Sequence, residues 1–324
     1  MSGYKIVFSD YYYPNLDAEL KEFEKLGEPV EIIDCTKIVP GGIFNPEELI
    51  PYVKDCDALV VQFSKITAQV IQSMEKCKII ARYAIGVDNI DLDAAREKGI
   101  MVANVPDYCI DEVANTAIAH IMNAMRKITV SRDMLLSGTF DMNAVRPMKR
   151  MKNAVLGLLG FGNIARDVAK KMKDFFAEIV VYDPYFQDVN SHPEVKFMTL
   201  EEVLKKADVL SVHVPLSPST QDMLSYEQFA VIKEGAVVVN TARGGLICED
   251  ALIQALDSGR VSYAGLDVIC TEDFENSKLL RHPKAALTPH VAWCSEEALA
   301  ELQKKVGINV VSALIKGEPV YRVK

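Results

Sequence analysis

Short apolar segments alternate along the first hundred residues with segments whose apolar residues recur every three or four positions. Uninterrupted apolar runs are typical of buried strands, and the wider spacing is typical of helices that bury one face. We expect strands at residues 5–9, 30–34, 58–63, 78–83 and 100–103. We expect helices at 16–26, 46–52 and 68–74, the second of them capped by Asn45.

The alternation returns in the second half of the chain, after a long helical pattern. From Pro106 small and apolar residues repeat at helical spacing to about Leu136, which predicts one buried or interface helix, and 142–151 is expected to be a surface excursion. Further strands are expected at 152–159, 177–182, 209–214, 236–240 and 263–268. Further helices are expected at 164–172, 200–206, 225–229, 249–257 and 296–315. Such an order favours an α/β fold with parallel sheets covered on both faces.

A glycine turn joins one of these strands to the helix that follows it. The apolar run ending at Leu159 is followed by Gly160 and Gly162, and then by a helical pattern beginning near Ile164. In a dinucleotide fingerprint one glycine makes the tight turn and the next lets the backbone approach a pyrophosphate. The free N–H groups of the helix start then face the phosphates. Ala165 takes the third small position, where helix and strand pack closely.

An acidic residue ends the next predicted strand. Asp183 lies 23 residues after Gly160, where a carboxylate can accept hydrogen bonds from a ribose 2′-hydroxyl. No Arg or Lys follows it closely, and an unpaired carboxylate would repel a 2′-phosphate. The spacing therefore predicts NAD rather than NADP as the cofactor.

The overall composition is that of a globular protein that can bury a large core. The 324 residues favour two domains, and a formal net charge of −9 argues against nucleic acid as a main partner. Neither a leader-like N-terminus nor an apolar run of membrane-spanning length is evident, so we expect no membrane partner and a cytoplasmic location. Seven scattered cysteines without metal-ligand spacing predict reduced thiols and no metal site.

Two stretches carry candidate chemistry outside the glycine turn. The loop 82–91 follows a predicted strand, and its small residues could turn backbone N–H groups toward an anion, although Gly86 and Asn89 would also suit a plain turn. In the second half Arg243, Glu272 and His290 each follow a predicted strand. Each has an ordinary structural explanation by itself. Together they suit a reduction in which Arg polarises a carbonyl, His donates a proton and a carboxylate orients the His.

Seven motifs, in order along the chain, resemble the NAD-dependent D-isomer-specific 2-hydroxyacid dehydrogenases, and especially the branch that contains the C-terminal-binding proteins. The motifs are RYAIGVDNIDL (82–92), VANVPDYCIDEV (102–113), LGLLGFGNI (156–164), VHVPL (212–216), VNTARGGL (239–246), GLDV (265–268) and TPHVAW (288–293). Four residues depart from the usual family pattern. They are Ala84 and Ile85 in the first motif, Ala165 where the family often has Gly, and Asp273 after Glu272 where a Pro is usual.

The resemblance implies roles for particular residues. Arg243 would bind substrate, and His290, paired with Glu272, would be the acid/base. The cofactor would be held by Gly160, Gly162, Asn163, Ile164, Asp183, His213, Val214, Pro215, Thr220, Thr241, Ala242 and Asp267. The substrate would be bound by the backbone of Tyr83, Ala84, Ile85 and Gly86, by Arg243 and by Trp293.

The family architecture implies two doubly wound parallel-sheet domains. Residues 1–104 and 293–324 would form a flavodoxin-like substrate domain, and residues 105–292 an inserted Rossmann NAD-binding domain. Closure of the two domains would exclude water. The resemblance also implies a homodimer formed through the cofactor domain.

The predicted function is interconversion of a small 2-keto acid and a D-2-hydroxy acid with NAD(H). One alternative is an NAD(H)-sensing protein similar to the corepressors of the C-terminal-binding branch. Another is a phosphoglycerate dehydrogenase, which would need cations near the substrate loop. Arg82 or the basic patch of Arg146, Lys149, Arg150 and Lys152 could supply them.

Overall fold

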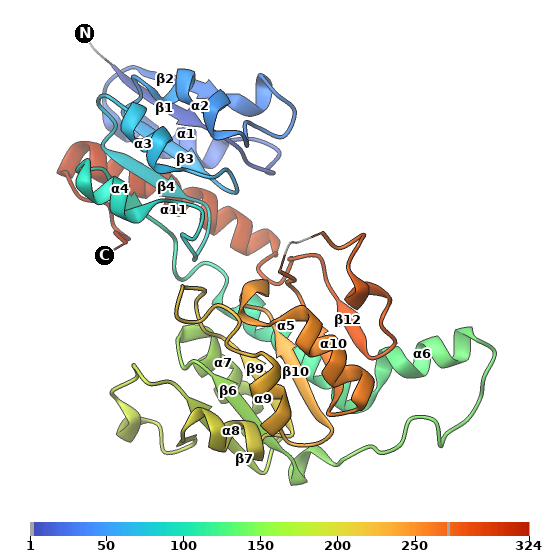
Figure 1. Ribbon diagram of the computed structural model, residues 1–324. Coiled ribbons are helices and arrows are strands. Elements are labelled where there is room, and N and C mark those ends of the chain that lie inside the picture. Colours follow the sequence, from blue (N-terminus) through green and yellow to red (C-terminus); the bar gives the residue numbers. More distant parts are fainter. Residues whose placement is uncertain (1–2, 271–272, 324) are drawn as a thin grey trace. The chain divides into compact units, whose positions relative to one another are not determined.

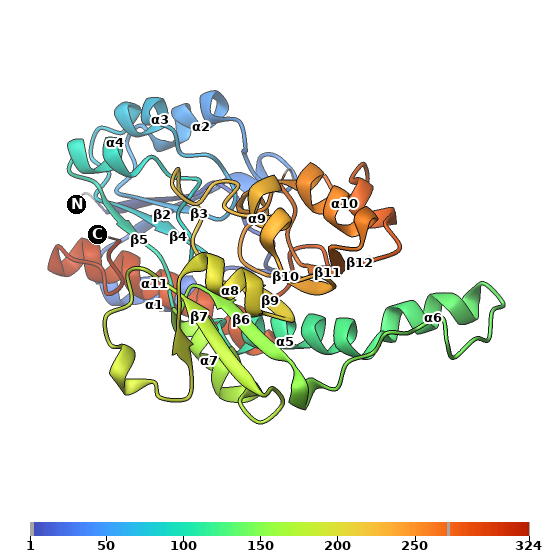
Figure 2. The ribbon, with the colours of Figure 1, turned by 60° about the horizontal axis from the view of Figure 1, so that its bottom comes forward.

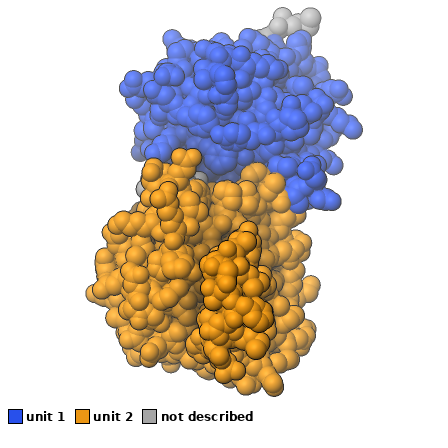
Figure 3. Space-filling model, turned by 90° about the vertical axis from the view of Figure 1, so that its right-hand side faces the viewer, with its two compact units in different colours: residues 1–108, 295–324 blue, residues 109–294 orange. Residues whose placement is uncertain are grey.

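The computed structural model describes residues 3–270 and 273–323, and the chain divides into two compact units. Unit 1 comprises residues 1–108 and 295–324, and unit 2 comprises residues 109–294; Figure 3 colours them separately. The sheets of both units pair in parallel throughout, so the predicted α/β class is confirmed.

Unit 1 is a five-stranded sheet in the order β2-β1-β3-β4-β5. Its strands are β1 (Tyr4–Phe8), β2 (Val30–Asp34), β3 (Ala58–Val61), β4 (Ile79–Arg82) and β5 (Met101–Ala103). Its α-helices are α1 (Asp17–Phe23), α2 (Pro46–Val53), α3 (Ala68–Ser73), α4 (Leu92–Glu97) and α11 (Glu296–Lys316). Helices α2, α3 and α4 cover one face, and α1 and α11 lie together on the other (Figure 2). This strand order is the flavodoxin-like one.

Unit 2 is a seven-stranded sheet in the order β12-β11-β10-β9-β6-β7-β8, which is the Rossmann order with one added strand. Its strands are β6 (Val155–Leu159), β7 (Glu178–Tyr182), β8 (Lys196–Phe197), β9 (Val209–Val212), β10 (Ala236–Asn240), β11 (Val261–Leu266) and β12 (Ala285–Leu287). Its α-helices are α5 (Ile110–Arg126), α6 (Ile128–Leu136), α7 (Asn163–Met172), α8 (Leu200–Lys206), α9 (Tyr226–Val231) and α10 (Glu249–Ser258) (Figure 1).

Two apolar cores enclose the sheet of unit 2, one on each face. Helices α5 and α7 pack on one face, and α8, α9 and α10 on the other. Short 3-10 helices complete the two units: η1 (Glu24–Leu26), η2 (Cys35–Lys37), η3 (Met151–Asn153), η4 (Val189–Ser191), η5 (Gly244–Leu246) and η6 (Lys278–Arg281).

The single helix expected from Pro106 to Leu136 is wrong. Lys127 has a left-handed backbone (φ 55°), and Asn123 Oδ1 accepts the N–H of Thr129, so the chain turns between α5 and α6. Helix α6 has no buried residue and projects from unit 2 (Figures 1 and 2). Because α6 packs against no core, no tertiary contact stabilises it as a straight continuation of α5.

Three short elements were not expected from the sequence. They are α4, whose N-terminal N–H groups are capped by Asp91 Oδ1 (3.0 Å to Ala94 N), and the edge strands β8 and β12. Each spans two to six residues, too few for a hydrophobic period to be visible. None of the helices in the described part of the chain is long and apolar enough to cross a bilayer, and all seven cysteines are free thiols.

Candidate active site

The glycine turn joins β6 to α7 at the carboxyl edge of the unit 2 sheet. Gly160 has a left-handed φ of 85°, and a Cβ there would lie 2.8 Å from the carbonyl oxygen of His213. Only glycine fits, because both the backbone angle and the close approach exclude a side chain. Gly162 caps α7 without a side-chain hydrogen bond, and a Cβ there would meet no atom within 4 Å. The start of α7 therefore faces open space with its N–H groups available to an anion.

Asp183 connects the end of β7 to this turn. Its Oδ2 accepts a hydrogen bond from the N–H of Phe161 (2.8 Å), and its Oδ1 accepts from Tyr185 and Phe186 (3.0 and 3.2 Å). Each carboxylate oxygen can accept more than one hydrogen bond, so a ribose hydroxyl could still be bound. The guanidinium of Arg166 in α7 lies 5.9 Å from the ring of Phe186, the residue whose N–H donates to Asp183.

The loop after β9 lies against the glycine turn. The N–H of His213 donates to Leu159 O (2.8 Å), and its ring nitrogen Nε2 lies 2.9 Å from the hydroxyl of Ser211. Burial lowers the pKa of His213 to about 4, so this ring is neutral at pH 7. Val214 and Pro215 follow, and Thr220 Oγ1 donates to Pro215 O (2.7 Å), which closes the loop.

The turn after β10 carries Thr241, Ala242 and Arg243. Asn240 holds it from both sides, because its Oδ1 accepts from Ala242 N (3.0 Å) and its Nδ2 donates to Arg243 O (2.8 Å). The hydroxyl of Thr241 is buried and has no hydrogen-bond partner among the described residues. A buried polar atom without a partner is rare and indicates a place for a ligand atom.

Gly244 fixes the position of Arg243 relative to the chain after β11. A Cβ at Gly244 would lie 2.0 Å from both the carbonyl carbon and the oxygen of Ile269. The two loops therefore touch backbone to backbone. The guanidinium of Arg243 donates to Ala242 O (2.8 Å).

Asp267 holds the loop that carries His290. Its carboxylate is fully buried and accepts hydrogen bonds from the Thr288 hydroxyl (2.5 Å) and from the N–H groups of Val291 (3.1 Å) and Ala292 (2.9 Å). The N–H of His290 donates to the backbone oxygen of Asp267 (2.8 Å). Asp267 therefore acts as a clamp on residues 288–292, a use that the sequence did not indicate.

His290 itself has a left-handed backbone, with φ of 53°. For a residue that is not glycine this conformation costs about 1 kcal/mol or more, and such strain concentrates at functional sites. Its carbonyl oxygen accepts the indole N–H of Trp293 (2.8 Å), which ties the predicted pocket residue to the predicted acid/base. The third member of the predicted group, Glu272, lies outside the described residues.

One residue of this region was missed by sequence reasoning. His120 of α5 is buried, and its Nε2 lies 3.2 Å from the hydroxyl of Thr288. A Cβ added at Gly265 would lie 2.7 Å from the Cβ of His120, so the two backbones approach closely there. Burial lowers the pKa of His120. A lone His on the apolar face of a predicted helix was the signal that could have found it.

The predicted substrate loop lies in unit 1, at the carboxyl end of β4. Tyr83 is buried, and the carbonyl oxygens of Ala84 and Ile85 accept hydrogen bonds from Val105 N (2.9 Å) and Asn104 Nδ2 (2.6 Å). With these oxygens occupied, the N–H groups of Ala84, Ile85 and Gly86 donate to no acceptor within the described residues. Successive N–H groups of this kind can bind an anion where the backbone turns them toward one point.

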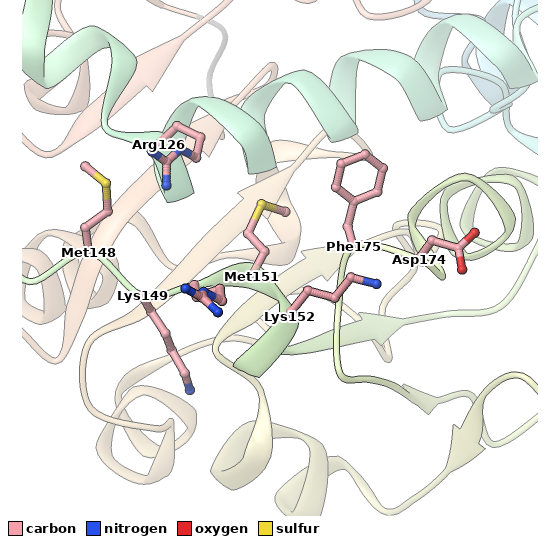
Figure 4. Close-up of a pocket in the computed structure, with 8 residues that line it drawn as sticks. Arg126, Met148, Lys149, Met151, Lys152, Asp174 and Phe175 are labelled. Carbon is pink, nitrogen blue, oxygen red and sulfur yellow. The ribbon is translucent and has the colours of Figure 1, made fainter.

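The basic patch does not belong to either carboxyl edge. Arg126 at the end of α5 and Lys149 to Lys152 before β6 lie at the amino edge of the unit 2 sheet, opposite the glycine turn. They line a cavity of about 470 Å³ together with Met148, Asp174 and Phe175 (Figure 4). Helices α5 and α7 end there, so the cations complement the negative ends of two helices. Lys149 is also paired with Asp208 (2.8 Å).

Comparison with known proteins identifies the family of the chain. Residues 118–292 match the family model of the D-isomer specific 2-hydroxyacid dehydrogenase, NAD binding domain. The chain is 38% identical over 274 residues to a hydroxypyruvate reductase of Thermotoga maritima, covering 83% of this chain and 87% of that protein. It is 36% identical over 320 residues to a D-3-phosphoglycerate dehydrogenase of Methanocaldococcus jannaschii, covering 97% of this chain but only 58% of that protein.

A solved structure extends the likeness over the whole chain. A glyoxylate reductase from Paecilomyes thermophila has a TM-score of 0.85 at 28% identity, with 100% of this chain and 99% of that chain covered. The comparisons do not distinguish the C-terminal-binding branch from the rest of the family. The chain belongs to the D-isomer specific 2-hydroxyacid dehydrogenases, a family of NAD-dependent oxidoreductases, and residues 118–292 match that family's NAD-binding domain.

Proposed function

We propose that this protein reduces a small 2-keto acid to the D-2-hydroxy acid with NADH, or catalyses the reverse oxidation. The observation that carries the proposal is the joint fixing of Arg243 and His290 at the edge where the glycine turn lies. Gly244 holds the first loop against Ile269, and Asp267 holds the second. The proteins it resembles include a hydroxypyruvate reductase and a glyoxylate reductase, which supports small 2-keto acids as substrates.

The residues of unit 2 fit a dinucleotide. Gly160, Gly162, Asn163 and Ile164 would hold the pyrophosphate through backbone N–H groups, and Asp183 would accept the ribose hydroxyls. The loop from His213 through Val214 and Pro215 to Thr220 would line the groove. Thr241, with its unpartnered buried hydroxyl, and Ala242 would lie at the nicotinamide. Asp267 would support this region from beneath by holding the neighbouring loop.

The chemistry needs one proton and one polarised carbonyl. When bound, NADH supplies the hydride to the carbonyl carbon of the substrate. Arg243 would hold the keto acid and polarise its carbonyl oxygen, and His290 would give the developing alkoxide its proton. Glu272 would orient the ring of His290 for this proton transfer. In the oxidative direction His290 would take the proton back.

Unit 1 would bind the substrate carboxylate. The N–H groups of Ala84, Ile85 and Gly86 are the donors, and Tyr83 fixes the start of the loop. Trp293 would shape the pocket around the substrate. We therefore assign residues 1–108 and 295–324 to binding the substrate carboxylate. Residues 109–294 would bind the cofactor, transfer the proton and supply Arg243 and Trp293 to the substrate.

A phosphoglycerate dehydrogenase would need cations near the substrate loop to bind the phosphate. Neither Arg82 nor the basic patch supports this alternative. Arg82 is buried, donates to Gln62 O (3.1 Å) and is paired with Asp88 (3.3 Å). The basic patch lies at the amino edge of unit 2. We therefore place an unphosphorylated keto acid first.

Within the helical pattern after Pro106, the exposed second half supports a homodimer through the cofactor domain better than the first half does. The small residues Ala114, Ala117 and Ala124 of α5 are buried within unit 2, so they are not available to a partner. Helix α6 and the segment after it instead expose apolar side chains. These are Ile128, Leu135, Leu136, Phe140 and Met142. We propose that a second copy of the chain buries them. The free thiols favour a cytoplasmic location, and the net charge of −9 favours neither nucleic acid nor an anionic membrane.

The deciding experiment is NADH oxidation with a panel of 2-keto acids. We expect turnover with at least one small member such as glyoxylate, hydroxypyruvate or pyruvate, and a D-configured product on a chiral column. If NADH binds tightly while no member of the panel is turned over, the enzyme assignment fails and the dinucleotide-sensing alternative takes its place.

Replacing His290 with Ala separates proton transfer from cofactor binding. We expect kcat to fall by about 10² to 10⁴, because the alkoxide loses its proton donor. The Kd of NADH, measured by fluorescence titration, should stay within a factor of about two. Wild-type kcat in this variant would show that another group donates the proton.

A further inference from the structure

A buried carboxylate lies behind the proposed substrate loop and takes no part in the proposed chemistry. Glu19 of α1 is 0% exposed, and no salt bridge to a cation joins it among the described residues. Burial raises its pKa, although hydrogen bonds from Tyr83 and Gln303 oppose the rise. Burying a carboxylate without a cation beside it is unfavourable, so the position of Glu19 needs a structural reason.

Tyr83 connects this carboxylate to the loop. Its hydroxyl donates to Glu19 Oε1 at 2.5 Å, and its ring, 2% exposed, packs edge-on against Tyr13 with centroids 5.0 Å apart. The backbone N–H of Tyr83 donates to Val61 O in the neighbouring strand (2.9 Å). The side chain and backbone of Tyr83 are therefore both fixed one residue before the three free N–H groups.

Helix α11 supplies the support behind Glu19. Gln303 Nε2 lies 3.2 Å from each oxygen of Glu19 and donates to the backbone oxygen of Asn15 (2.9 Å). The two helices approach closely at Gly307, where a Cβ would lie 3.2 Å from Glu19 Cα. The position of the carboxylate therefore depends on contacts far away in the sequence.

A second line of hydrogen bonds reaches the same loop from the same helix. Asn309 Nδ2 of α11 donates to the backbone oxygen of Asn104 (2.9 Å), and Asn104 Nδ2 donates to Ile85 O (2.6 Å). The loop is thus held at Tyr83 through Glu19 and Gln303, and at Ile85 through Asn104 and Asn309. Both lines begin on α11, six residues apart, and end on either side of Ala84.

We propose that Glu19 is a positioning residue for the substrate. Acting through Tyr83, it sets the direction of the N–H groups of residues 84–86 and so determines the affinity for the 2-keto acid carboxylate. Loss of these contacts should raise the keto-acid KM and should not change the Kd of the cofactor, because every one of them lies within unit 1. The inference rests on the proposed function for the identity of the anion.

The test compares two tyrosines of unit 1 that each donate to a carboxylate. In Tyr83→Phe we expect the keto-acid KM to rise about tenfold, with kcat and the Kd of NADH changed less than about twofold, since a small displacement of a binding group is enough. Tyr11→Phe is the matched control, because the Tyr11 hydroxyl donates to Asp34 (2.8 Å) and to neither line, and the variant keeps the ring that stacks on Tyr13. Glu19→Gln keeps an acceptor for Tyr83 and should stay within about threefold of wild-type KM, whereas Glu19→Ala should resemble Tyr83→Phe.

A second measurement keeps the inference testable without turnover. Amide hydrogen exchange by mass spectrometry should become faster in peptides covering 84–87 in Tyr83→Phe, with peptides of β6 and α7 unchanged. If KM and exchange both match those of Tyr11→Phe, Glu19 does not position the loop. If wild type turns over no keto acid but exchange at 84–87 rises, the positioning role stands and the proposed function fails.

Discussion

The two sheets are built alike at their amino edges and differently at their carboxyl edges. In unit 1 Asp57 precedes β3 and accepts the N–H of Lys5, the second residue of β1, at 2.8 Å. In unit 2 Asp208 precedes β9 and accepts the N–H of Val155, the first residue of β6, at 2.9 Å. Both aspartates also pair with lysines. The same clamp joins the same two neighbouring strands in each unit.

Two particular contacts of the unit 2 edge and the loop after β4 in unit 1 are held by different means. In unit 2 the loops touch through glycines, at Gly160 and Gly244, where no side chain fits. In unit 1 the loop after β4 is held by side chains that come from other elements, Glu19 and Asn104 among them. Contacts between backbones suit a cofactor whose shape is the same for every substrate. Contacts made by side chains can be altered by a single substitution, so a loop held in this way can be adapted to a different substrate.

The largest expected effect breaks the backbone contact in unit 2. Gly244→Ala would place a methyl group inside the backbone of Ile269, 2.0 Å from its carbonyl, so we expect a loss of at least about 3 kcal/mol in the free energy of unfolding in urea. Gly162→Ala is the matched control, because its Cβ would meet nothing within 4 Å and its φ is −71°. That variant should keep its stability and lose NADH affinity. Equal stability of the two variants would show that the loops do not depend on this contact.

A second pair of variants separates the two edges by their kinetics. Asp267→Asn and Asp10→Asn each put an amide N–H against backbone donors, and Asp10 accepts from Gln62, Phe63 and Ser64 much as Asp267 accepts from Val291 and Ala292. Each should lose about 2 kcal/mol of stability. We expect the loss in Asp267→Asn to lower kcat and the loss in Asp10→Asn to raise the keto-acid KM. The comparison fails if both variants change the same constant.

Local signals carried much of the fold and little of the support behind the site. The strand, the glycine turn and the helix at 155–172 were predictable because their residues are neighbours in the sequence. The order of both sheets followed from strand–helix alternation and a family resemblance. Gly244 looked like an ordinary turn residue, because its need for glycine comes from Ile269 across the fold. Tyr83 and Glu19 are 64 residues apart, and no period in the sequence joins them.

The same reasoning explains the error at Lys127. Apolar spacing continues past it, but the sequence does not show that the sheet behind α5 has ended by that point. The clamp made by Asp267 was missed for a related reason, since the carboxylate was considered only in relation to the cofactor. Hydrogen bonds from a loop more than twenty residues later cannot be deduced from its position after a strand.

A smaller effect is expected on the preference of the unit 2 site for NADH over NADPH. Asp183→Ala should lower the preference for NADH over NADPH about tenfold, because it removes the charge that would repel a 2′-phosphate. The ratio of kcat/KM for the two cofactors measures it. Asp188→Ala, a few residues later on an exposed loop, is the control. An unchanged ratio would contradict the ribose assignment.

The smallest expected effect is the pH-dependent stability that Asp208 contributes at the amino edge of unit 2. Burial alone would raise the pKa of Asp208, but hydrogen bonds from Lys149, Lys233 and the N–H of Val155 lower it below the ordinary value of 3.8. A lowered folded-state pKa means stability that is present above pH 3.8 and lost as the pH falls through the folded value. Asp208→Asn should therefore be about 1 kcal/mol less stable than wild type at pH 7, and the difference should shrink as the pH falls below about 4. Urea unfolding across this range measures it. If the difference in stability between wild type and Asp208→Asn persists at low pH, the negative charge of Asp208 is not the source of the stabilisation.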